Sequence, residues 1–390
     1  MAPREWARGC VGDMAHVTAT RARLGRLALP AAVLALSACA PPHGSAPVHS
    51  GAPATPVASV TPAIRQPLIA VLDRPFGAAP NTLRLLSPDG VEVAETPIDP
   101  DAEAITAAGP RLLIAGAGKL QAIERDGTST ALPSLPGDAQ ADLVRGLVAD
   151  PGGTAWLWSS VSESASGAES RLYLSGPGTP VALLLDRHQA GTALQPVAWT
   201  AGGPVVSEEP LGIGGYVLFR RTFGAASLLD VGARTLRPLA GIECAFSDLA
   251  ADGTVACVSD GREGPHGSAP VTLHLLRPGH PAVTVALPTS VRQAGAALFR
   301  PGGGAVSLAL SPALGEGQEQ VETDLVDVAS GARHAFGPAG VMPAAWLPDG
   351  RLVAVRLPGM AGGGPGTYVV AADGTAALIS PASTVVGILA

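Results

Sequence analysis

Residues 343–355 read PAAWLPDGRLVAV, in which an aromatic residue and a Pro-Asp-Gly turn precede an apolar strand. Asp-Gly between two apolar runs is a strong hairpin signal, because glycine tolerates the positive φ that a tight turn requires. Weaker copies are QPVAWTAGG at 195–203 and AALFRPGG at 296–303, where the aromatic residue and the turn keep their order. The stretch therefore indicates a repeating unit.

Two kinds of turn alternate along the chain and define this unit. The first joins two apolar strands and recurs at spacings of 43 to 50 residues; the second follows a strand with period-2 alternation. Each unit thus predicts two antiparallel hairpins, or four strands, which is typical of a β-propeller blade. First turns begin at residues 109, 152, 202, 252, 302 and 349, and second turns lie at 89–90, 126–127, 176–178, 230–232, 278–279, 327–331 and 373–374.

The first unit lacks its leading strand, since it begins directly at LIAVL, residues 68–72. The chain ends in TVVGILA at 384–390, which matches the leading strand LVRGLVA at 143–149. We therefore expect the last strand to complete the first blade and close the ring, which removes free sheet edges. Seven second turns predict an all-β, seven-bladed propeller of four-stranded antiparallel blades.

The stretch at 343–355 resembles the repeat of TolB-like propellers, and the resemblance covers about residues 66–390. It implies that the aromatic residue packs between neighbouring blades and that Asp-Gly forms the tight turn. The family includes partner-binding periplasmic and lipoprotein modules and the propeller halves of peptidases. Since no peptidase domain follows the repeats in this sequence, the resemblance favours the partner-binding branch.

The N-terminal region is typical of a bacterial lipoprotein signal. Three arginines precede the apolar run LALPAAVLAL at 27–36, which is too short to span a bilayer, and Leu36-Ser-Ala-Cys39 reads as a lipobox. This resemblance implies that Cys39 carries a diacylglyceryl group and palmitate at the extracytoplasmic face of the cell membrane. The alternative is cleavage at the small-x-small site 38–40, which would release a soluble protein. A start at Met14 would give a more compact signal.

The chain is accordingly divided into three segments. Residues 1–38 are expected to form the signal peptide, and residues 39–64 the lipidated cysteine followed by a tether rich in proline, alanine and serine. Residues 65–390 are expected to form the propeller domain.

The charge balance restricts the partners of the mature protein. The chain has a formal charge of −7; residues 1–38 contribute +3, which leaves −10 for the rest. An acidic chain with Lys119 as its single lysine is a poor candidate for binding nucleic acid or anionic lipid. We expect a monomer that attaches to the membrane through the Cys39 lipid and binds an envelope protein or a cell-wall glycan.

Two cysteines remain in the predicted domain, Cys244 and Cys257, on either side of the Asp252-Gly253 turn. In a hairpin the two would lie nearly opposite each other, and the extracytoplasmic compartment is oxidising. A disulfide is therefore predicted, with two buried free thiols as the alternative.

No catalytic, cofactor-binding or metal-binding set is predicted. His274 occupies a polar position of an alternating strand and is interpreted as solvated. The carboxylates of Asp99, Asp101 and Glu103 are interpreted as an acidic loop between blades rather than a Ca²⁺ site. Trp156 and Trp158 are interpreted as core between blades rather than a sugar platform.

The sequence therefore predicts a non-catalytic binding or scaffold module of the cell envelope. The alternative is a secreted hydrolase or lyase whose site lies in the central channel. Its discriminating feature would be carboxylates or histidines that converge at one mouth of the ring. Residues to inspect on the innermost strands are Arg145, Asp248 and Gln293.

Overall fold

The computed structural model describes residues 66–73, 81–116, 118–133, 143–164, 167–211, 222, 226–239, 242, 244–259, 270–312, 320–382 and 384–390. They belong to the unit Pro62–Ala390. The predicted signal peptide, Cys39 and the tether lie outside these residues. The part of the chain that is described contains no helix, so none there is long and apolar enough to cross a bilayer.

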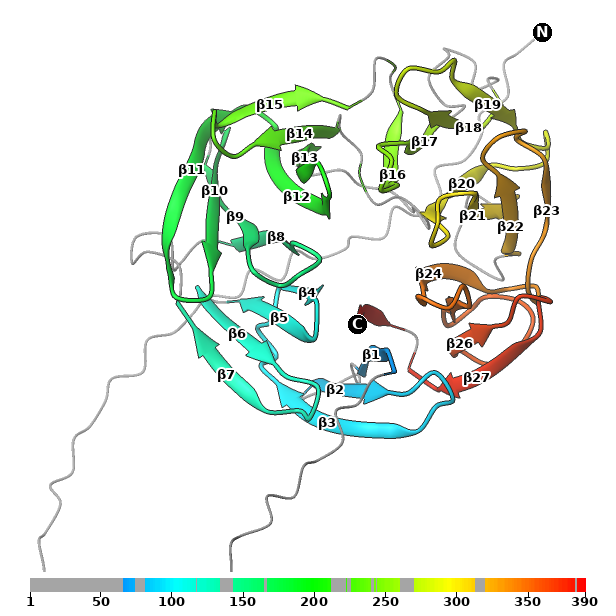
Figure 1. Cartoon of the computed structure of the whole chain (residues 1–390), viewed down its shortest axis with the longest axis horizontal. Coiled ribbons are helices and arrows are strands. Elements are labelled where there is room, and N and C mark those ends of the chain that lie inside the picture. Colours follow the sequence, from blue (N-terminus) through cyan, green and yellow to red (C-terminus); the bar gives the residue numbers. More distant parts are fainter. Residues whose placement is uncertain are drawn as a thin grey trace, which may run out of the picture. The chain divides into compact units, whose positions relative to one another are not determined.

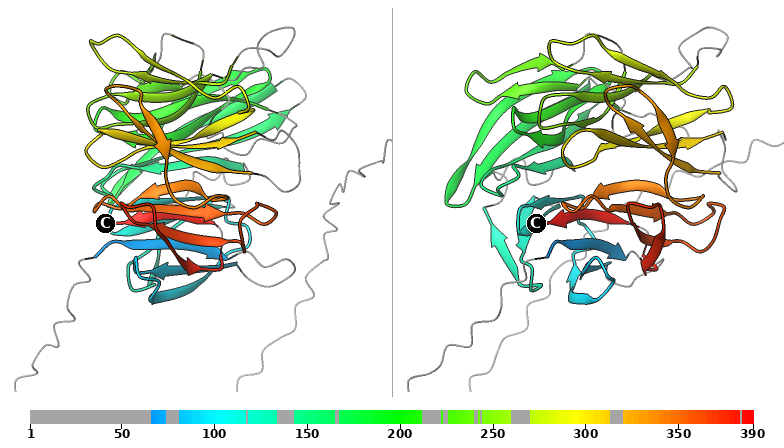
Figure 2. Two further views of the ribbon diagram at one scale, coloured as in Figure 1. Left: turned by 90° about the vertical axis from the view of Figure 1, so that its right-hand side faces the viewer. Right: turned by 45° about the vertical axis from the view of Figure 1, so that its right-hand side comes forward.

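Twenty-eight strands form seven antiparallel four-stranded sheets, which Figures 1 and 2 show around a common centre. The predicted fold class is confirmed. Blades 1 to 3 consist of β28 (Val385–Leu389), β1 (Leu68–Asp73), β2 (Asn81–Leu86), β3 (Glu92–Ile98); β4 (Ala104–Ala108), β5 (Arg111–Gly116), β6 (Lys119–Ile123), β7 (Ser129–Leu132); and β8 (Leu143–Ala149), β9 (Trp156–Ser164), β10 (Gly167–Gly176), β11 (Thr179–Gln189).

The remaining blades follow the same order from the innermost to the outermost strand. Blades 4 to 7 consist of β12 (Thr192–Thr200), β13 (Gly203–Pro210), β14 (Ala226–Asp230), β15 (Thr235–Pro238); β16 (Ala245–Leu249), β17 (Val255–Ser259), β18 (Thr272–Leu276), β19 (Val283–Ala286); β20 (Gln293–Phe299), β21 (Ala305–Ser311), β22 (Glu322–Asp327), β23 (Arg333–Ala335); and β24 (Met342–Trp346), β25 (Leu352–Arg356), β26 (Gly366–Val370), β27 (Ala376–Ser380).

The last strand closes the ring, as predicted. β28 pairs antiparallel with β1, and Leu389 lies opposite Leu68. Arg125, from the β6–β7 turn, holds both partners in place: its Nη1 donates to the carbonyl of Ala390 at 2.8 Å and its Nη2 to the carbonyl of Gln66. The closure is thus fixed by strand pairing and by one side chain of the next blade.

The predicted turns connect the first to the second and the third to the fourth strand of a blade, so they share one side of the ring, here called the turn face. In the five Asp-Gly turns, the glycine has φ of +83° or +84°, which only glycine adopts readily. In four of these turns the preceding aspartate accepts a backbone hydrogen bond from the residue two positions on, as Asp126 does from Thr128 at 2.9 Å. This bond lowers the pKa of Asp126.

Apolar side chains between neighbouring blades make the core. Trp156 and Trp158 of β9 are almost completely buried and pack in one cluster with Ala108 and Leu113 of blade 2. The interpretation of these tryptophans as inter-blade core is confirmed. At the inner ends the blades approach so closely that a Cβ at Gly146 would lie 2.7 Å from the carbonyl oxygen of Pro196.

Candidate functional site

A hollow opens on the turn face between blades 4 and 5. It has a volume of about 380 Å³ and is bounded by the β12–β13 turn, β15, the β16–β17 turn and the end of β18. A second hollow of about 650 Å³ adjoins it along blade 4 and shares the turn residues Thr200, Ala201 and Gly202 with it. The two hollows together are called the junction groove below; Figure 1 shows β15 and β16, strands of the two blades whose residues line the first hollow.

The floor of the groove is aliphatic. Leu228 and Leu239 contribute from blade 4, and Leu249, Val255 and Leu276 from blade 5. All five belong to the apolar cluster that separates these two blades, but the four leucines are only partly buried. Core side chains are therefore reachable from solvent at this junction, and a ligand that covers them gains hydrophobic stabilisation.

Two arginines supply the charge of the first hollow. Arg237 lies in β15 and Arg277 directly after β18, and they are its charged lining residues. Neither makes an ion pair with any of the described acidic residues, whereas six other arginines of the ring do: Arg84, Arg111, Arg171, Arg187, Arg333 and Arg351. The hollow thus has a positive rim over an apolar floor.

Asp252 in the β16–β17 turn is an acidic neighbour of this rim. A hydrogen bond from the Thr254 backbone N–H lowers the pKa of Asp252 most, and the charge of Arg277 lowers it further. Asp252 is not a lining residue, and its carboxylate already accepts the Thr254 bond at 2.9 Å. Arg277 therefore retains donors for an incoming anion.

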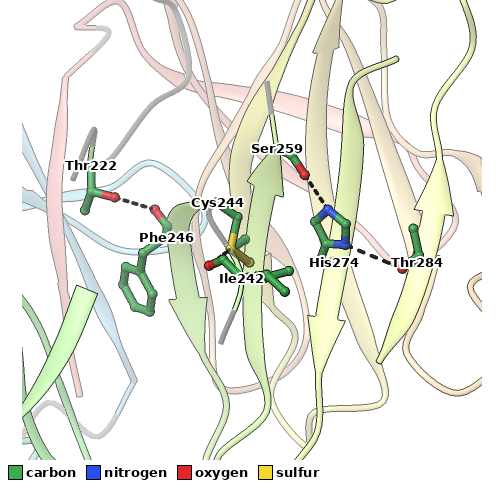
Figure 3. The surroundings of a disulfide bond; sticks show 8 residues. Thr222, Ile242, Cys244, Phe246, Ser259, His274 and Thr284 are labelled. Carbon is green, nitrogen blue, oxygen red and sulfur yellow. Dashed lines mark hydrogen bonds between the residues drawn. A yellow bond between two sulfur atoms is a disulfide. The ribbon is translucent and has the colours of Figure 1, made fainter. Parts of the chain in front are cut away.

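A disulfide lies behind the groove, between Cys244 and Cys257, with a Cα–Cα distance of 5.6 Å (Figure 3). The structure thus joins the predicted pair. Cys257, in β17, is paired with Phe246 of β16, so Cys244 is offset by two residues from the directly opposite position. Thr222 adds a link, since its hydroxyl donates to the carbonyl of Phe246 at 3.2 Å. The inner hairpin of blade 5 is therefore held on two sides.

Replacing both cysteines, Cys244→Ser with Cys257→Ser, should lower the free energy of unfolding by about 3 kcal/mol. The bridge joins residues 13 positions apart, and closing a loop of about 15 residues in the unfolded chain contributes roughly this much. Urea titrations followed by tryptophan fluorescence measure this loss. Dithiothreitol should shift the wild-type transition to that of the double variant and leave the variant unchanged. An identical midpoint for the oxidised wild type and the variant would contradict a stabilising role of the bridge.

The central channel does not gather the predicted candidates. Among the described residues of the seven innermost strands, the charged ones are Arg145 in β8 and Asp248 in β16, and there is no histidine. Asp248 accepts the backbone N–H of Phe299 at 2.8 Å and so joins blade 5 to blade 6. Gln293, at the start of β20, is buried. The three residues lie on three different strands, and Asp248 links two neighbouring blades.

The acidic stretch at residues 99–103 has local structural roles. Asp99 accepts the backbone N–H of Asp101 at 2.9 Å, within the turn. Glu103 accepts the backbone N–H of Val144, and so connects blade 2 to the innermost strand of blade 3. Across the described part of the chain, no three histidine, cysteine or acidic side chains are placed to share a metal ion.

His274 is less exposed than its place in the sequence suggests. Its ring lies on the face of blade 5, where Nε2 is hydrogen-bonded to the hydroxyl of Ser259 and Nδ1 lies 3.4 Å from that of Thr284 (Figure 3). The prediction of a solvated side chain holds only in part: the residue is partly buried, and hydroxyl side chains of both neighbouring strands contact the ring. Partial burial lowers the pKa of His274.

Stability should consequently fall on mild acidification. The unfolded chain protonates His274 near pH 6.5, above the pKa of the folded chain, so it binds more protons in that range and gains free energy relative to the native state. The contribution of neutral His274 to the free energy of unfolding is complete above about pH 6.5. It decreases as the pH falls from there towards the lower pKa of the folded chain. Urea midpoints between pH 7.5 and 5.5 should fall less steeply for His274→Gln than for the wild type. The exposed His334→Gln control should follow the wild type, and parallel curves for all three proteins would refute the assignment.

Comparisons with known proteins show the fold alone. No family model matches the chain, and neither does any curated protein. The acylaminoacyl peptidase of Pyrococcus horikoshii is similar in structure, with a TM-score of 0.52, 13% identity and coverage of 80% of this chain and 52% of the peptidase. The chain thus spans about half the length of that enzyme.

Two further solved structures are similar at lower scores. A protein described as TolB from Agrobacterium tumefaciens has a TM-score of 0.43 and 17% identity, with 74% of this chain and 96% of that protein covered. The β-propeller domain of the Trilobed protease from Pyrococcus furiosus has a TM-score of 0.42 and 11% identity, with coverage of 80% and 85%.

Proposed function

We propose that this chain is a non-catalytic binding module of the cell envelope, held at the extracytoplasmic face of the membrane by a lipid on Cys39. The junction groove is the observation that carries the proposal. Partly buried aliphatic side chains beside two arginines that make no ion pair with a described acidic residue are features of a recognition site, because both groups gain free energy when a complementary partner covers them.

Two observations favour this function over a hydrolase with a site in the channel. The described innermost strands carry one carboxylate, Asp248, which is already hydrogen-bonded to the backbone of Phe299. The Ser259–His274 pair lies away from the channel, on β17 and β18, and a threonine rather than a carboxylate faces the second ring nitrogen. General-base activation of a serine usually relies on such a carboxylate to orient the histidine.

The proposal is tested by crosslinking and co-purification from the native host. The tagged full-length protein is compared with an Arg237→Gln, Arg277→Gln variant, with Cys39→Ala, and with an Arg234→Gln, Arg292→Gln control that removes the same charge outside the groove. We expect one partner class with the wild type and the control. At least tenfold less should be recovered with the groove variant, and none with the unanchored Cys39→Ala form.

If the groove variant recovered as much partner as the wild type, the junction groove would not be the binding site. Turnover of esters or lactones by the purified protein, unaffected by the groove variant, would instead establish the hydrolase alternative.

A further inference from the structure

We infer that the junction groove binds an extended polypeptide segment in which an acidic residue lies next to aliphatic residues. The inference rests on the proposed function and names the chemistry of the partner at that same site. Three features of the groove lead to it: the placement of its arginines, the composition of its lining, and the strand that borders both hollows.

The two arginines face the first hollow from opposite sides. Arg237 belongs to blade 4 and Arg277 to blade 5, so an anion between them would be contacted from both walls. A guanidinium presents a planar fork of donors that matches a carboxylate, and neither fork makes an ion pair with a described acidic residue, although Asp252 feels the charge of Arg277. In a chain with a net charge of −7, such a positive hollow selects a negatively charged group.

The lining favours a peptide over a glycan. Apart from the two arginines, Thr200 is the one residue that lines the first hollow with a polar side chain; the others are glycine, alanine, proline, valine and leucine. A sugar ring needs hydrogen-bonding partners of both kinds or an aromatic platform; the side chains of the first hollow offer donors from the two arginines and one hydroxyl, and its lining has no aromatic residue, whereas Trp199 lines only the second hollow. Aliphatic side chains of a peptide need only the apolar floor.

The second hollow favours a peptide over an acyl chain. It continues past the Thr200 turn to Trp199, Asp230 and Thr235, so a polar region follows the apolar one along the groove. A lipid tail is apolar along its whole length, whereas an extended peptide alternates its side chains. β15 borders both hollows and is the last strand of its sheet, so no described strand pairs with its outer edge. A peptide can add main-chain hydrogen bonds at such an edge.

The test is selection of a phage-displayed dodecapeptide library on the full chain in detergent. We expect enriched sequences in which Asp or Glu is flanked by Leu, Ile or Val. For the best peptide, fluorescence anisotropy should show at least a tenfold higher Kd when its acidic residue is replaced by the amide. The Arg237→Gln, Arg277→Gln variant should raise the Kd by at least the same factor, and added salt should raise it further. The Arg234→Gln, Arg292→Gln control should stay within about twofold of the wild type.

Enrichment without acidic residues, no enrichment, or affinity that the groove variant leaves unchanged would overturn the inference. The proposed function is separated from it by the native crosslinking experiment. A glycan or lipid recovered there in a groove-dependent manner keeps the binding function and overturns the peptide assignment. Recovery that does not depend on the groove overturns both.

Discussion

Removing residues 384–390 is expected to lower the free energy of unfolding by about 5 kcal/mol or more, or to leave the chain unfolded. This segment contains β28, the innermost strand of blade 1. Leu389 is completely buried in the cluster with Leu68, while Ile388 packs against the cluster that contains Ile69 on the other face. Losing one buried leucine alone costs about 2–5 kcal/mol, and here the strand pairing with β1 is lost as well.

Urea unfolding followed by circular dichroism measures this effect. A synthetic peptide of sequence TVVGILA, added in trans, should restore part of the lost stability because it can reoccupy the vacant edge of β1. Leu378→Ser, at an exposed position of β27, is the control and should leave the midpoint unchanged. A truncated chain as stable as the full chain would show that the ring does not depend on this closure.

Trp158→Ala should destabilise the propeller by about 3–5 kcal/mol. The side chain is 1% exposed, stacks against Tyr173 with ring centroids 6.0 Å apart, and fills the space between blades 2 and 3. Its removal leaves a cavity that neighbouring strands cannot close without losing their register. The loss is measured by urea unfolding.

Trp346→Ala provides the comparison, because this indole is only partly buried and should cost less to remove. Part of its effect would come from the hydrogen bond that Nε1 donates to the carbonyl of Leu298 at 3.0 Å. Equal losses for the two variants would contradict the view that burial between blades 2 and 3 sets the cost at Trp158.

The architecture was predictable because its signals are local and repeated. Each turn of a repeat predicts its own hairpin, and seven second turns along one chain leave few other arrangements. The closure by residues 384–390 followed from the missing strand before residue 68. The disulfide followed from one hairpin, since both cysteines flank the same turn.

The junction groove was not predictable from the sequence, because its residues come from two repeats and look like ordinary core. Leu228 and Leu249 occupy apolar strand positions and belong to the apolar cluster between blades 4 and 5. Arg237 and Arg277 lie 40 positions apart, in different repeats, and no pattern within either repeat pairs them. The partial burial of His274 was not predictable for a similar reason: Ser259 and Thr284, which contact its ring, lie on the strands to either side.

Site-specific photocrosslinking in the native host tests the central claim, that the junction groove is the binding site, most directly. The photoreactive residue p-benzoylphenylalanine replaces Leu239 in the groove, and, in a separate protein, Leu183, which is exposed on the outer strand of blade 3. We predict that irradiation joins the Leu239 position to one polypeptide and gives no such product at Leu183. The same product from both positions, or none from Leu239, would contradict the assignment of the groove as the binding site.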